Sequence, residues 1–165
     1  MQIHIIDGPP SLWATDLVRQ IALRPTSRNF LCIPNFSKRV DLNRVTTHTL
    51  STIIQDSIRD LIERIDVARE SKYSILFLDW SPITYLAYAK LKWIDIGPID
   101  MEYIDLLSCL IDRHTRVSLR LPNTGFPFPK SMKTMTPEEA YSFGWHLKNE
   151  YKLRFPTKIK VIWLP

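Results

Sequence analysis

Cysteine and glycine are scarce in this chain, and long apolar runs are absent from it. Only two cysteines, Cys32 and Cys109, occur among the 165 residues. This excludes a disulfide scaffold, and we expect both cysteines to be small core residues of a protein in a reducing compartment. No apolar run reaches the roughly 18 residues that a membrane span requires, so we expect no membrane partner.

The amino-terminal segment lacks the features of an export signal. Residues 1–7 contain no basic group before Asp7, whereas a secretory signal peptide begins with a positively charged region. We therefore expect a cytoplasmic protein. Its small size would suit a viral origin, in which case the expected compartment is the host cytoplasm.

The composition is otherwise that of one ordinary globular domain. Hydrophobic residues make up 45% of the chain and charged residues 24%, both close to globular averages. We see no repeat, low-complexity tract or linker, so we predict a single domain over residues 1–165. With four glycines against twelve prolines, few positions can adopt positive φ cheaply.

The positive charge is concentrated in the last third of the chain. Residues 1–110 contain 12 Lys and Arg against 13 Asp and Glu, a net charge of −1, whereas residues 111–165 contain 10 against 4, a net charge of +6. This asymmetry favours a polyanionic partner such as phosphate or nucleic acid. The alternative is a solvated basic surface that only aids solubility.

Short apolar runs alternate with amphipathic segments along the chain. The runs predict strands, and the segments with apolar residues three or four positions apart predict helices. Ser81 followed by Pro82, and Thr136 followed by Pro137 and Glu139, are typical helix starts. The predicted strands cover 3–6, 30–33, 74–78, 116–121 and 158–164, and the main predicted helices cover 11–23, 49–70, 82–91, 100–111 and 137–153.

This order predicts an α/β domain with a five-stranded, mostly parallel sheet that is covered by helices on both faces. Ligands of such sheets bind beyond the carboxyl ends of the strands. A functional site is therefore expected among residues 7–15, 34–39, 79–82 and the loop 122–135.

The first strand is followed by an incomplete phosphate-binding loop. The pattern of such a loop is Gly-x-x-x-x-Gly-Lys-Ser/Thr, and residues 8–15 read GPPSLWAT. Gly8 and Thr15 match, but Trp13 replaces the second glycine and Ala14 replaces the lysine. The backbone cradle and its point charge are thus both lost, although Ser11 and Thr15 at the helix start still offer a weak anion site. Trp13 is alternatively a core aromatic residue.

The chain resembles the P-loop nucleoside and nucleotide kinases, especially the small AAA-like ATPases and kinases that include the ribosylnicotinamide-kinase type. The resemblance rests on the degenerate loop 8–15, on ILFLDWSP at 75–82 with LAYAKL at 86–91, on the strand that ends at Pro122, and on TPEEA at 136–140 before the last helix and strand. It covers almost the whole chain. It implies a three-layer α/β/α fold in which the strands lie in the order 2-3-1-4-5.

The resemblance also implies roles for individual residues. Asp79 occupies the position of the family's catalytic base or Mg²⁺ contact, whereas Trp80 replaces an arginine that holds phosphate. Loop 122–135 corresponds to the lid. It carries Lys130 and Lys133, which would bind phosphate, but no arginine.

These losses remove much of what phosphoryl transfer requires, because that reaction depends on positioning and on positive charge around the phosphate. We expect no cofactor, and Mg²⁺ with ATP only if the protein is an active kinase. The four histidines show no metal-ligand spacing, so no metal site is expected.

Aromatic and basic side chains are the candidates for partner binding. Aromatic rings can stack on bases, and Arg or Lys can neutralise phosphates. The partner-binding candidates are Trp13, Trp80, Arg113, Arg116, Arg120, Phe126 and Phe128, with Trp145 as a further ring. Phe126 and Phe128 alternatively anchor a proline-stiffened loop.

Three functions remain open on the sequence. The first is a degenerate nucleotide-kinase-like protein that acts by binding a protein or nucleic acid. The second is an active nucleotide, nucleoside or nucleic-acid base kinase with an atypical phosphate loop. The third is a plain nucleic-acid-binding protein. Nothing in the sequence indicates an oligomeric state.

Overall fold

The computed structural model describes residues 1–9, 17, 20, 30–33, 44–128, 130 and 135–165. The described elements are β1 (Gln2–Asp7), β2 (Phe30–Ile33), α2 (Thr47–Glu70), β3 (Ile75–Leu78), α3 (Pro82–Leu91), α4 (Pro98–Ile111), the 3₁₀ turn η3 (Asp112–His114), β4 (Thr115–Pro122), α5 (Pro137–Arg154) and β5 (Ile159–Leu164).

The strands form one parallel sheet in the order β2-β3-β1-β4-β5. β1 lies at its centre, where Ile5 pairs with Leu78 of β3 and with Val117 of β4. The α/β class with a parallel sheet is confirmed. The apolar sequence of β1 fits this central position, because its side chains point to the faces of the sheet, and the faces of a central parallel strand are usually covered.

Local capping explains where three of the helices begin. Ser81 and Thr136 each accept a hydrogen bond from the backbone of the first turn, and each has a Pro immediately after it. Both starts were predicted. α2 begins two residues earlier than predicted, because Thr46 forms a capping box with Thr49 in place of the more usual Glu or Gln.

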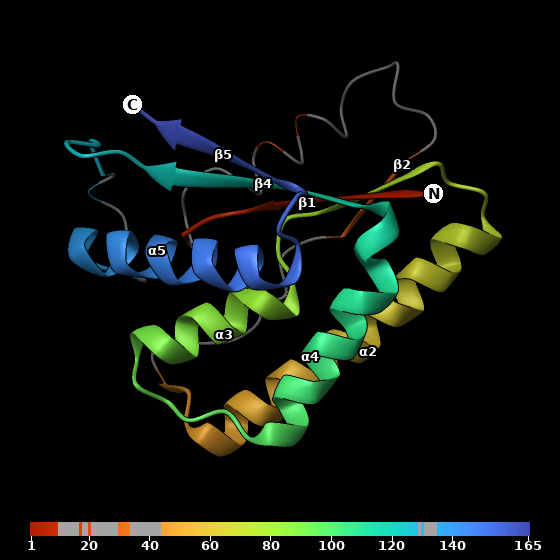
Figure 1. Cartoon of the computed structure of the whole chain (residues 1–165), viewed down its shortest axis with the longest axis horizontal. Helices are drawn as coiled ribbons and strands as arrows, with labels where there is room; N and C mark the ends of the chain where they lie inside the picture. Colours follow the sequence, from red (N-terminus) through yellow and green to blue (C-terminus); the bar gives the residue numbers. More distant parts are fainter. Residues whose placement is uncertain (10–16, 18–19, 21–29, 34–43, 129, 131–134) are drawn as a thin grey trace.

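The core lies between the sheet and the described helices. In Figure 1, α2, α3, α4 and α5 lie on the same side of the sheet. Alternate residues of β1, β3 and β4 face these helices and are buried, and they are Ile3, Ile5, Leu76, Leu78, Val117, Leu119 and Leu121. This is the period-two burial of a strand with one face against a core.

The opposite layer of the predicted three-layer arrangement stays a prediction. The helix expected there, over 11–23, lies outside the described residues except for Leu17 and Gln20, which are both helical.

Two further expectations can be compared with the structure. Cys109 is exposed on α4, so its prediction as a core residue is wrong. The apolar sequence around it misled, because α4 carries apolar side chains on its outer face as well as its inner one. The side chain of Cys32 lies outside what the structure describes. Among the described residues, no helix is both long and apolar enough to cross a membrane.

Candidate functional site

Two aspartates meet where the central strands end. Asp7 is the last residue of β1, and Asp79 follows β3, the parallel neighbour of β1. Their side chains are only 1% and 2% exposed. A buried pair of carboxyl groups at the carboxyl edge of a parallel sheet is the expected place for a site in this fold class.

Asp7 is the centre of a hydrogen-bond network that joins three elements. Its Oδ2 accepts hydrogen bonds from Oγ1 of Thr84 at 2.6 Å and from Oη of Tyr151 at 2.7 Å. Its Oδ1 accepts one from the backbone N–H of Gly8 at 2.8 Å. The Tyr151 hydroxyl also lies 2.7 Å from Oγ of Ser81. We call Asp7, Ser81, Thr84 and Tyr151 the Asp7 network; it ties β1 to α3 and α5.

Burial dominates the ionisation of this network. Desolvation and, to a smaller extent, the nearby Asp79 charge raise the pKa of Asp7 to about 6, although its three hydrogen bonds favour the charged form. Burial also raises the pKa of Tyr151 and of Tyr85, and the Asp7 charge adds to both shifts. Both tyrosines therefore stay neutral at ordinary pH, and Tyr151 donates a hydrogen bond to Asp7.

Gly8 is required by a close approach of two strands. A Cβ atom at this position would lie 2.4 Å from the carbonyl oxygen of Arg120 in β4. Since this contact is with backbone, the neighbour cannot move aside easily, and only glycine fits. The match of Gly8 to a phosphate-loop glycine therefore has a packing explanation within the sheet.

The remaining phosphate-binding predictions are only partly within the described structure. Ser11, Trp13, Thr15 and Lys133 lie outside the described residues. Lys130 is exposed beyond the end of β4. Among the residues that the structure describes, no group of three or more His, Cys, Asp or Glu side chains could hold a metal ion.

Trp80 was predicted to bind a partner, and this prediction is wrong. Its side chain is 1% exposed and belongs to the core, where its ring lies 6.2 Å from that of Tyr85. The position that would hold a phosphate-binding arginine thus contributes to packing. A tryptophan at this position supplies apolar area to the core.

Phe126 is also wrongly predicted as a stacking residue, because it is buried against Leu164. Its ring meets that of Phe128 edge-on at 4.9 Å, and Phe128 meets Tyr141 of α5 in the same way at 5.4 Å. The Tyr141 hydroxyl donates a hydrogen bond to the carbonyl oxygen of Asn123 at 2.8 Å. The alternative interpretation, in which these phenylalanines anchor the loop, agrees with this geometry.

The three predicted basic residues of the β4 region do not form one cluster. Arg113 precedes β4 and is exposed, and Arg116 is exposed near the start of the strand. Arg120 is half-buried near its end. Lys130 lies beyond the opposite end of β4 from Arg113, so the structure does not bring these predicted residues together into one surface.

An aromatic and basic surface lies instead on α5 and β5. Trp145 is 63% exposed and Trp163 is 54% exposed. The ammonium group of Lys148 lies 5.5 Å from the centroid of the Trp163 ring. Tyr141, Trp145 and Lys148 follow one another at helical spacing and therefore share a face of α5. We call Tyr141, Trp145, Lys148 and Trp163 the α5–β5 face; the contact between Lys148 and Trp163 joins the two elements.

Sequence reasoning missed most of both sites. Asp7 stood directly before the motif glycine and could have been found as an acid at a strand end. Thr84 and Tyr151 could not, because they lie 77 and 144 residues from Asp7. Trp145 was considered, whereas Lys148 and Trp163 were missed, although the spacing from Tyr141 to Lys148 was visible.

No family model matches the sequence, and no curated protein matches it. Solved structures do match. The crystal structure of NadR protein in complex with NR matches with a TM-score of 0.67 and 19% sequence identity. This match covers 97% of this chain and 45% of the NadR chain. A crystal structure of NadR protein in complex with NAD and AMP-PNP matches with a TM-score of 0.67 and 20% sequence identity. This match covers 97% of this chain and 44% of that chain.

These similarities show that the chain shares its overall fold with the matched part of NadR. At this level of identity they show the fold alone. The chain spans less than half the length of the solved chains that it matches.

Proposed function

We propose that this chain is a nucleotide-kinase-like protein that has lost ATP-dependent phosphoryl transfer and acts by binding single-stranded nucleic acid. The observation that carries the proposal is the α5–β5 face, where exposed aromatic rings alternate with a lysine on the most basic part of the chain. The fold in this proposal is the full three-layer one, with the helix predicted over 11–23 on the second face of the sheet.

The loss of phosphoryl transfer is supported by the state of the two aspartates. Both oxygens of Asp7 already accept hydrogen bonds from protein groups. Asp79 is 2% exposed, so its carboxyl group has little access to solvent. A carboxylate that serves as a base or holds Mg²⁺ must reach its substrate or ion. These residues, as arranged, do not fit a magnesium site.

The sequence of the phosphate loop supports the same conclusion. Trp13 and Ala14 replace the glycine and lysine that cradle and neutralise the phosphates of ATP. Without them, the remaining elements are a helix start and the hydroxyl groups of Ser11 and Thr15. We therefore propose that Gly8 and the Asp7 network are retained for folding.

The chemistry of the α5–β5 face suits a single strand. Stacking on exposed aromatic rings is tolerant of sequence, because every base has a flat face, and lysines neutralise the backbone. Lys152, one turn beyond Lys148, is exposed as well. Glu150, by contrast, is buried, and it is bonded to Lys90 and Arg154. Its negative charge is thus directed away from the face.

An active kinase is the second candidate, and one observation favours it. Asp79 lies at the end of β3, where the family resemblance assigns a catalytic base. In this alternative the phosphate loop would bind ATP by contacts other than those of the usual motif. The two candidates differ in their demand for ATP.

Isothermal titration calorimetry with Mg-ATP separates these candidates. The proposal expects no heat of binding at ligand concentrations up to about 1 mM, the range of weak nucleotide affinity. Micromolar binding, together with phosphate transfer that Asp79→Ala abolishes, would establish the kinase instead.

Fluorescence anisotropy of a labelled single-stranded oligonucleotide tests the binding surface. We expect binding that weakens steeply with salt, and Lys148→Ala should lower the salt slope by about 0.7, the value for one contact with a single strand. Trp145→Ala should weaken binding by about 1 to 3 kcal/mol per lost stack. Val67→Ala is the control, since Val67 is 49% exposed on α2, a helix outside this face. Equal losses from Trp145→Ala and Val67→Ala would contradict the proposed surface.

A further inference from the structure

Helix α4 carries apolar side chains on two faces. One face is buried in the core and includes Ile104, Leu107 and Ile111. A second row is 49% to 72% exposed and consists of Ile99, Tyr103, Leu106 and Leu110. We call this row the α4 stripe. Its spacing of four, three and four residues gives a continuous line along the helix, which is about 21 Å long for its 14 residues.

We propose that the α4 stripe is the contact surface of a homodimer, in which α4 of a second copy packs against it in antiparallel orientation. The positions of the stripe are symmetric about the point between Ile104 and Asp105. A two-fold axis there would bring Ile99 of one copy to Leu110 of the other, and Tyr103 to Leu106. Every member of the stripe would then meet an apolar partner, which is the condition for an isologous interface.

The charges at the two ends of α4 favour this orientation. Asp95 is exposed just before the helix, and Arg113 and His114 are exposed just after it. An antiparallel pair would place Asp95 of each copy near the basic end of the other. A parallel pair would place like charges together and align the helix dipoles unfavourably.

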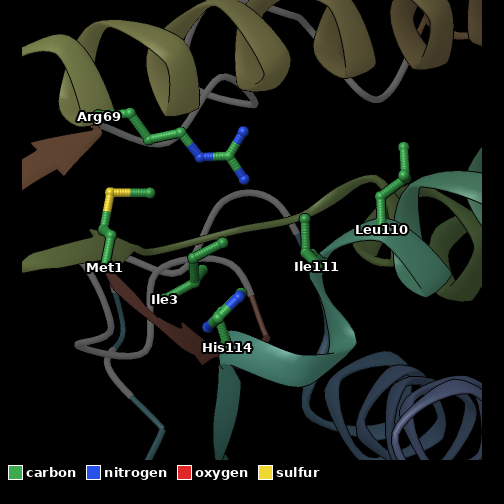
Figure 2. A pocket seen from close by; sticks show the side chains of 6 residues that line it. All are labelled: Met1, Ile3, Arg69, Leu110, Ile111 and His114. Carbon is green, nitrogen blue, oxygen red and sulfur yellow. The ribbon is translucent and has the colours of Figure 1, made fainter.

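One end of α4 has a protruding side chain, and the other end has a hollow. Trp93 precedes the helix and is 94% exposed. Its φ of 56° is the left-handed conformation that ends α3, where the N–H of Ile94 donates to the carbonyl oxygen of Ala89. At the other end lies a hollow of about 80 Å³ lined by Met1, Ile3, Arg69, Leu110, Ile111 and His114. Figure 2 shows Arg69 reaching over the hollow from α2, with His114 on the opposite side.

In the antiparallel dimer, Trp93 of one copy would lie toward the hollow of the other. The apolar lining from Ile3, Leu110 and Ile111 suits the edge of an indole ring, and the Arg69 guanidinium suits its face. This contact would explain why a large aromatic side chain is exposed to water in the single chain.

The size of the surface predicts a weak dimer. The stripe exposes roughly 500 Å² of side chain per copy, which is at the upper end of the apolar patches found on monomers. Two copies together reach about 1,000 Å², the lower limit of a specific interface. We therefore expect a dimer that forms at tens of micromolar chain, about 10 to 100 µM.

Sedimentation equilibrium of the whole chain tests the dimer. Leu106→Glu should raise the dissociation constant about 100-fold or more, because it removes an apolar contact and places a carboxylate at the two-fold axis. Val67→Glu is the matched control, since Val67 is 49% exposed on α2 and lies outside the stripe. Circular dichroism should show both variants folded. A wild-type chain that stays monomeric at 1 mM, or a dimer that Leu106→Glu leaves intact, would overturn the proposal.

Crosslinking with a short bismaleimide tests the orientation. In the antiparallel arrangement, Leu106→Cys should crosslink readily to its counterpart, since the two positions lie three residues apart along the paired helices. Leu110→Cys should crosslink poorly to itself but well to Ile99→Cys in a mixture of the two variants. The wild-type chain reports the background from Cys32 and Cys109. Efficient self-crosslinking of Leu110→Cys would overturn the antiparallel arrangement.

The dimer does not depend on the proposed function. Its tests use the chain without nucleotide or nucleic acid, so either proposal can fail while the other stands.

Discussion

The Asp7 network and the α4 stripe differ in opposite ways from an ordinary distribution of residues. The network places a carboxyl group and three hydroxyl groups in the interior, and hydrogen bonds connect all four. The stripe places four large apolar side chains in water. Buried polar groups are tolerated when they are bonded, whereas an exposed apolar row gains stability only when something covers it. The comparison indicates that the network acts on folding and the stripe on association.

The largest effect should come from Gly8→Ala, beside the network. The new Cβ atom would lie 2.4 Å from the Arg120 carbonyl oxygen, and strand β4 would have to shift. We expect the free energy of unfolding to fall by about 3 kcal/mol or more. Gly97→Ala is the control, because the nearest atom to its Cβ would be 3.9 Å away. Urea denaturation of both variants gives the comparison, and equal stabilities would show that β1 and β4 can separate locally.

Changes of pH should affect the network through Asp7. Its pKa is raised to about 6 in the folded chain, so the folded state holds the proton more tightly than the unfolded state does. Stability is therefore fully present at low pH, below the unfolded pKa near 4, and it is lost as pH rises through 6. Between pH 4 and pH 7, the free energy of unfolding is expected to fall by an amount on the order of 3 kcal/mol.

Asp7→Asn provides the control for this pH dependence. An amide keeps one acceptor for the Gly8 N–H, and the hydroxyl groups of Thr84 and Tyr151 can accept its N–H bonds. Stability curves of the variant, measured by urea denaturation from pH 4 to pH 7, should lack the decline. A wild-type decline that persists in Asp7→Asn would assign it to another group.

The same substitution made in both regions sharpens the contrast. Tyr151→Phe removes the donor to Asp7 and the bond to Ser81, and it should reduce the free energy of unfolding by about 2 kcal/mol. Tyr103→Phe removes a hydroxyl group from a side chain that is 49% exposed. This substitution should change the free energy of unfolding by less than about 0.5 kcal/mol. Thermal or urea denaturation at neutral pH measures both, and a larger effect at Tyr103 would reverse the assignment of roles.

The smallest effect on folding is expected from the stripe itself. Leu106→Ser and Leu110→Ser should each alter the free energy of unfolding by less than about 0.5 kcal/mol, because both side chains are already more than half exposed. The measurement is made at about 1 µM chain, below the expected dimer range. Losses near those of a buried leucine, about 2 kcal/mol or more, would mean that the stripe supports the fold of the single chain.

Much of the fold could be predicted because its causes are local. The apolar runs at 30–33 and 74–78 depend on residues that are neighbours in sequence, and so do the starts of α3 at Ser81 and of α5 at Thr136. The strand order required the family resemblance as well. α4 showed the limit of local reasoning, since an apolar helix with Cys109 in it does not reveal which of its faces meets the core.

The sequence by itself determined the alternation of strands and helices, the missing glycine and lysine of the phosphate loop, and the excess of positive charge after residue 110. Each of these depends on residue identity and short-range spacing alone. Tertiary structure decided the rest: it buried Trp80 and Phe126, exposed Cys109, and brought Tyr151 to Asp7 across 144 residues. Burial is a property of what packs against a side chain, and the packing partners of these residues come from distant parts of the chain that only the folded sheet and helices bring together.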